Sequence, residues 1–135
     1  MFGPQGGLRI SAKDLSKIGR LLLGCGALDG VRLLKPESVR AMIGPEWSLK
    51  DGNGLTLEED DPIRSKGGFT CRYGLAVHTL ASGLPDCGDD PVGDGVQRIG
   101  HSGNAYGLLA GLWVDRKAGT GVVYFSTGND TPEPG

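Results

Sequence analysis

One strand-like run and two apolar segments near the C-terminus constrain the fold of this chain most strongly. The runs Val96–Ile99, Leu108–Val114 and Val122–Phe125 each have the length of a β-strand. A polar connector that ends in glycine, Asp115–Gly119, separates the last two runs. Strand-length apolar runs joined by short connectors with turn residues are typical of antiparallel hairpins. The stretch Val96–Thr127 therefore predicts a meander of three antiparallel strands.

Two helices are predicted before this meander. Ser11 and Asp14 have the spacing of a helix capping pair, so the first helix is expected over Ala12–Leu23. Its apolar stripe follows the helical repeat: Leu15, Ile18, Leu22 and Cys25. Pro36 at a first helical position predicts a second helix, which Gly44 and the proline after it end.

Between the helices and the meander, one further strand and two loops are expected. Phe69–Leu80 alternates in polarity and is predicted to be a strand, with His78 as a half-buried residue of the sheet. Residues 48–68 and 82–95 are polar and rich in glycine or aspartate, which predicts surface loops. A calcium loop beginning at Asp51 would need glycine at its sixth position and glutamate at its twelfth, and it has neither.

The expected class is α+β: two N-terminal helices, then an antiparallel sheet of about four strands. Two helices can cover only one face of such a sheet, and the sequence offers nothing for the other face. We therefore expect residues 1–135 to form a single partial domain of a larger unit.

Composition excludes several classes of partner. The formal net charge of -2 argues against nucleic acid. No apolar run approaches the roughly 18 residues of a membrane span, and the first residues do not have the pattern of a signal peptide. Cys71 and Cys87 flank a strand and a loop; the sequence leaves open whether they form a disulfide or remain free thiols.

The most chemically suggestive stretch is Gly100-His101-Ser102-Gly103-Asn104. It fits four positions of the Gly-x-Ser-x-Gly nucleophile elbow, and Asn104 breaks the fifth. Because neither histidine of the chain follows Ser102, the serine–acid–histidine order of that fold cannot be completed within it. An α/β-hydrolase fragment with Ser102 as nucleophile is therefore the weakest alternative. His78, His101 and the cysteines lack the spacing of a metal site, so we expect no metal and no cofactor.

The order of three motifs resembles the C-terminal part of class C β-lactamase-related serine hydrolases, which include penicillin-binding-protein-like peptidases and esterases. Residues 6–15, Gly-Gly-Leu-Arg-Ile-Ser-Ala-Lys-Asp-Leu, are similar to the family's entry into a helix. Residues 28–39, Leu-Asp-Gly-Val-Arg-Leu-Leu-Lys-Pro-Glu-Ser-Val, are similar to its link between two helices. Gly100-His101-Ser102-Gly103 resembles its third motif, Lys-Thr-Gly or, in the esterase-like branch, His-x-Gly.

The resemblance implies a β-lactamase/transpeptidase-like fold and acyl-enzyme hydrolysis of a small ester, amide or β-lactam. His101, Ser102 and Gly103 would line one wall of the site, and the backbone N–H of Asn104 would be one oxyanion-hole donor. Histidine in place of lysine removes a fixed positive charge, which favours ester or amide substrates. The family also implies a periplasmic or secreted location.

The family's nucleophile is absent from this chain, because no serine is followed by lysine three residues later. Tyr124-Phe125-Ser126 mimics the family's Tyr-x-Ser but lies in the last predicted strand, so Tyr124 is interpreted as a sheet residue. The chain alone is thus predicted to be inactive and to need the missing N-terminal half of the domain. The alternative is a non-catalytic remnant or binding module of the same fold.

Overall fold

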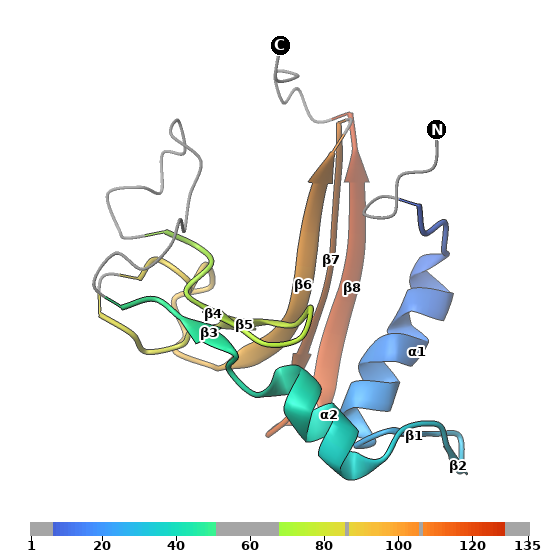
Figure 1. The fold of residues 1–135 in the computed structure, drawn as a ribbon. Helices are drawn as coiled ribbons and strands as arrows, with labels where there is room; N and C mark the ends of the chain where they lie inside the picture. The colour runs from blue at the N-terminus through green and yellow to red at the C-terminus, as the bar shows by residue number, and fades with distance from the viewer. Residues whose placement is uncertain (1–6, 51–67, 86, 106, 129–135) are drawn as a thin grey trace.

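The computed structural model describes residues 7–50, 68–85, 87–105 and 107–128 and has an α+β fold (Figure 1). Its long sheet is antiparallel throughout, with strands in chain order from β3 to β8. A separate two-stranded ribbon joins the helices. The elements are α1 (Ala12–Leu23), β1 (Ala27–Leu28), β2 (Val31–Arg32), α2 (Pro36–Ile43), β3 (Trp47–Ser48), β4 (Arg72–Tyr73), β5 (His78–Leu80), β6 (Arg98–Ala105), β7 (Leu108–Asp115) and β8 (Thr120–Thr127).

Both predicted helices are confirmed. The side chain of Ser11 accepts the backbone N–H of Asp14, which satisfies one of the free donors at the start of α1. The apolar face of α1 packs on β7 and β8, where Gly19 approaches the side chain of Leu112 closely. α2 begins at Pro36 and contributes Val39 to the core.

One face of the sheet carries the core, and α1 lies along that face (Figure 1). Ile99 and Val114 are paired neighbours on β6 and β7 and point into this core. On the opposite face, Trp113 is only 6% exposed because the rings of Phe69 and His78 pack against it. The next residue of that face on β8, Val122, is 52% exposed, so this face is partly uncovered within the described residues.

The prediction of a single strand over Phe69–Leu80 is wrong. The segment forms two short strands, β4 and β5, which pair with each other through Tyr73 and His78. Between them the chain turns at Leu75-Ala76, and Ala76 takes a φ of 57°. The backbone N–H of Leu75 donates to the carbonyl oxygen of Met42 in α2, so a contact distant in sequence stabilises this turn. The long sheet accordingly has six strands instead of about four.

Four smaller expectations have different outcomes. His78 is buried, with 3% of its surface exposed, instead of half-buried. The predicted loop 48–68 and the Asp51 segment lie almost entirely outside the described residues, although Ser48 ends β3. The predicted loop 82–95 has no helix or strand among its described residues. No helix in the described part of the chain is long and apolar enough to cross a membrane.

Candidate functional site on the open edge of β6

The predicted motif His101-Ser102-Gly103 lies inside strand β6, not after a strand as expected from Val96–Ile99. On one side β6 is paired with β7 from Ile99 to Ala105. On the other side β5 pairs with β6 only as far as Gly100. Within the described residues, His101–Asn104 therefore has one edge without a strand partner, which we call the open edge.

The direction of one carbonyl group shows which backbone groups reach the open edge. The carbonyl oxygen of Ser102 contacts Nδ1 of His101, and the same imidazole contacts Tyr73 of β4. The Ser102 carbonyl thus points to the β4–β5 side of β6. Backbone N–H and C=O groups in an antiparallel strand repeat their direction every second residue. The N–H of Asn104 consequently points to the open edge as well.

Two contacts orient the ring of His101. A carbonyl oxygen only accepts, so Nδ1 must carry the hydrogen in its bond to Ser102. Nε2 of the same ring contacts the hydroxyl of Tyr73. Burial raises the pKa of Tyr73 above its usual value, so the phenol remains protonated at neutral pH. The imidazole is thereby oriented at the open edge.

Gly103 faces open space, in contrast to Gly100. A Cβ at Gly103 would meet nothing within 4 Å, and its φ lies outside the left-handed region. A Cβ at Gly100 would collide with the carbonyl oxygen of Leu112. Packing within the described chain thus explains glycine at 100, whereas nothing in the described structure requires it at 103. Glycine at 103 leaves the backbone there open to close approach.

Ser102 does not have the geometry of a nucleophile. It is paired with Gly111 in a regular ladder, whereas a nucleophile elbow is a sharp turn between a strand and a helix. The His101 ring contacts the carbonyl of Ser102, and no contact with its hydroxyl is found among the described residues. The alternative with Ser102 as nucleophile is therefore disfavoured.

The buried histidine His78 adjoins this site on the face of the sheet that carries Trp113. His78 packs edge-on against Phe69 and Trp113 and stacks on Tyr73. Burial lowers the pKa of His78, although a hydrogen bond with the backbone of Phe69 opposes this effect. Its Nε2 has no hydrogen-bond partner in the described part of the chain. The ring is thus a neutral packing element beneath Tyr73.

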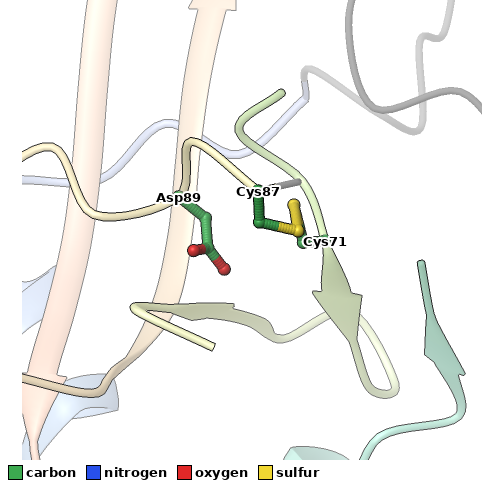
Figure 2. A group of neighbouring side chains, drawn as sticks. All are labelled: Cys71, Cys87 and Asp89. Atoms are coloured by element: carbon green, nitrogen blue, oxygen red, sulfur yellow. A yellow bond between two sulfur atoms is a disulfide. The ribbon is translucent and has the colours of Figure 1, made fainter. Parts of the chain in front are cut away.

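Cys71 and Cys87 form a disulfide, which answers the question that the sequence left open. Figure 2 shows the carboxylate of Asp89 close to the two sulfurs, and the three ligand atoms lie within 4.8 Å of one another. Sulfurs bonded to each other are not the thiolates that bind metals. One oxygen of Asp89 accepts the backbone N–H of Ser82 at 3.0 Å, so this carboxylate holds Asp89 beside Ser82.

Sequence reasoning missed Tyr73 as a residue of the site. Tyr73 and His101 are 28 positions apart, and only the pairing of β4 with β5 and of β5 with β6 brings them together. Tyr73 stood in an alternating row with Leu75 and Val77, which looked like an ordinary strand pattern. The one available signal was a hydroxyl-bearing aromatic residue in a strand predicted to join the same sheet.

Comparison with known proteins identifies two relatives from Mycobacterium tuberculosis. The chain is 57% identical over 76 residues to the uncharacterized protein MT1414 of strain CDC 1551 / Oshkosh. It has the same identity over the same length to protein Rv1367c of strain ATCC 25618 / H37Rv. Each match covers 45% of this chain and 19% of the relative, so the chain spans a small part of the relatives' length. No family model and no solved structure matches.

Proposed function

We propose that this chain is the C-terminal portion of a serine hydrolase related to class C β-lactamases, and that β6 forms one wall of its acyl-transfer site. The observation that carries the proposal is the open edge. A strand that bears His-Ser-Gly leaves this edge unpaired and aims the backbone N–H of Asn104 at it. A substrate could lie along the edge and pair with its backbone as an additional strand would.

The proposed chemistry assigns a separate role to each residue. The N–H of Asn104 stabilises the oxyanion that forms when a nucleophile attacks a carbonyl group; loss of one such donor typically costs about 10²–10³ in rate. Gly103 leaves room for the substrate at the backbone. His101, oriented by Tyr73, places an imidazole where the family's lysine would place a permanent cation. This pattern suits uncharged ester or amide groups better than a carboxylate-bearing β-lactam.

The nucleophilic serine and its lysine base belong, in this proposal, to residues outside the chain. The short match to two much longer relatives is compatible with this division. The competing proposal is a non-catalytic binding module that kept the sheet and lost the chemistry. The absence of Ser-x-x-Lys from residues 1–135 is the observation that favours it.

The test compares the chain with a version extended by the coding sequence immediately upstream in its genome. The proposal expects an upstream Ser-x-x-Lys and hydrolysis of a p-nitrophenyl ester by the extended protein. Gly103→Val should lower kcat/KM at least about tenfold by crowding the open edge, and Tyr73→Phe should lower it about tenfold by releasing His101.

Tyr124→Phe is the matched control, because it removes a tyrosine hydroxyl from β8 at a position 40% exposed to solvent. Its kcat/KM should be unchanged. An extended protein without Ser-x-x-Lys, or one that folds and hydrolyses no ester, would favour the binding module.

A further inference from the structure

A cavity of about 480 Å³ lies on the helix-covered face of the sheet and is lined by residues other than those of the open edge. Its floor is a row of paired residues across three strands: Thr79, Ile99 and Val114. Ile43 at the end of α2 lines one wall, and the turn between β7 and β8 lines another. Cavities of about 300–1,000 Å³ with apolar walls and a few polar groups are typical of small-molecule sites.

The charges around this cavity are predominantly positive in a chain whose formal net charge is -2. Arg72, Arg116 and Lys117 line it, and Asp115 is the only acidic residue of the lining among the described residues. One carboxylate oxygen of Asp115 accepts the backbone N–H groups of Lys117 and Ala118, which fixes the turn. The cavity therefore concentrates cationic side chains over an apolar floor.

Arg72 supplies the observation that points to a ligand. Its Nε is buried and has no hydrogen-bond partner among the described residues. A buried donor left without an acceptor is unfavourable, and such groups usually find a partner in folded proteins. Among the described residues, no ion pair involves Arg72, Arg116 or Lys117, although the guanidinium of Arg116 donates to Sγ of Cys25 at 3.6 Å. The planar guanidinium fork matches carboxylate and phosphate groups, which accept two parallel hydrogen bonds.

We propose that this cavity binds a small organic anion. Its carboxylate or phosphate group pairs with Arg72 and with the cations of the β7–β8 turn, and a short apolar body lies over Ile99 and Val114. This site is separate from the open edge and does not depend on hydrolase activity. Its ligand would be a metabolite-sized molecule with one charged end.

The experiment is a ¹⁵N-edited NMR titration of the folded chain with butyrate and with butyl phosphate, and with n-butanol as the uncharged probe. Saturable shifts are expected at the backbone amides of Ile99, Val114 and Lys117, for at least one of the two anions. Butanol should bind at least about tenfold more weakly. The anion that binds more tightly identifies the ligand as a carboxylate or a phosphate ester.

Arg72→Gln should weaken anion binding about tenfold or more, and Lys117→Gln, in an exposed turn, should weaken it several-fold. Arg9→Gln is the matched control, because it removes one positive charge from an exposed position outside the cavity and should leave affinity unchanged. Where Arg72→Gln does not fold, the Lys117 variant decides. Absence of saturable anion binding, equal binding of butanol, or equal weakening by Arg9→Gln would overturn the proposal.

Discussion

Gly100 and Gly103 lie three residues apart on β6, and the structure predicts opposite effects of alanine at the two positions. At Gly100 the new Cβ would collide with the carbonyl oxygen of Leu112 and come within 2.9 Å of the Trp113 ring. Overpacking of this kind costs about 1–3 kcal/mol, because β6 or β7 must shift. In a chain of this size such a cost lowers Tm by about 4–12 °C.

At Gly103 the new Cβ would meet nothing within 4 Å, and φ is outside the left-handed region. Gly→Ala at a compatible position stabilises by about 0.4–1 kcal/mol, because it reduces the entropy of the unfolded chain. Gly103→Ala should therefore keep Tm unchanged or raise it by up to about 4 °C.

The assay is thermal unfolding of the parent chain and both variants side by side, followed by circular dichroism. A drop in Tm for Gly103→Ala as large as that for Gly100→Ala would refute the claim that Gly103 faces open space. An unchanged Tm for Gly100→Ala would refute the close approach of β6 and β7 at that position.

Three further predictions concern pH and redox state. Because burial lowers the pKa of His78 in the folded chain, its contribution to stability is present above about pH 6.5 and is lost as pH falls below that value. The Tm of the parent chain should thus decline between pH 7.5 and 5.5, and a shallower decline is expected for His78→Leu; equal slopes would contradict this. Reduction of Cys71–Cys87, which are 16 positions apart, should destabilise the chain by about 3 kcal/mol in denaturant melts, and an unchanged midpoint would contradict it. Hydrogen bonding to Arg98 holds the pKa of Asp94 at about 2, so Arg98→Gln should raise it toward its ordinary value in a carboxyl-carbon NMR titration; no change would exclude that cause.

The sequence predicted those elements whose signals are local. The bounds of α1 follow from the capping residue Ser11 and the helical repeat after it, and both signals lie within a few residues of the helix. β7 and β8 follow from two apolar runs separated by a connector that turns at residues 116–119. Each of these features can be recognised without knowing what the segment packs against.

The sequence failed where distant contacts decide the local structure. Alternation continues through Leu75-Ala76, so nothing in the pattern marks the turn between β4 and β5. The carbonyl oxygen of Met42 in α2 accepts the N–H of Leu75 and stabilises the turn. The contact between Tyr73 and His101 escaped prediction for the same reason, because it depends on the pairing of β4, β5 and β6.

The most direct test of the proposed hydrolase site is covalent labelling with a fluorophosphonate, read by intact mass and by the position of the adduct. The proposal predicts no adduct on the chain alone. It predicts a single adduct on the extended protein, at the serine of an upstream Ser-x-x-Lys. An adduct on Ser102 in either protein would contradict the account, because the nucleophile would then lie on the strand to which the proposal assigns substrate binding.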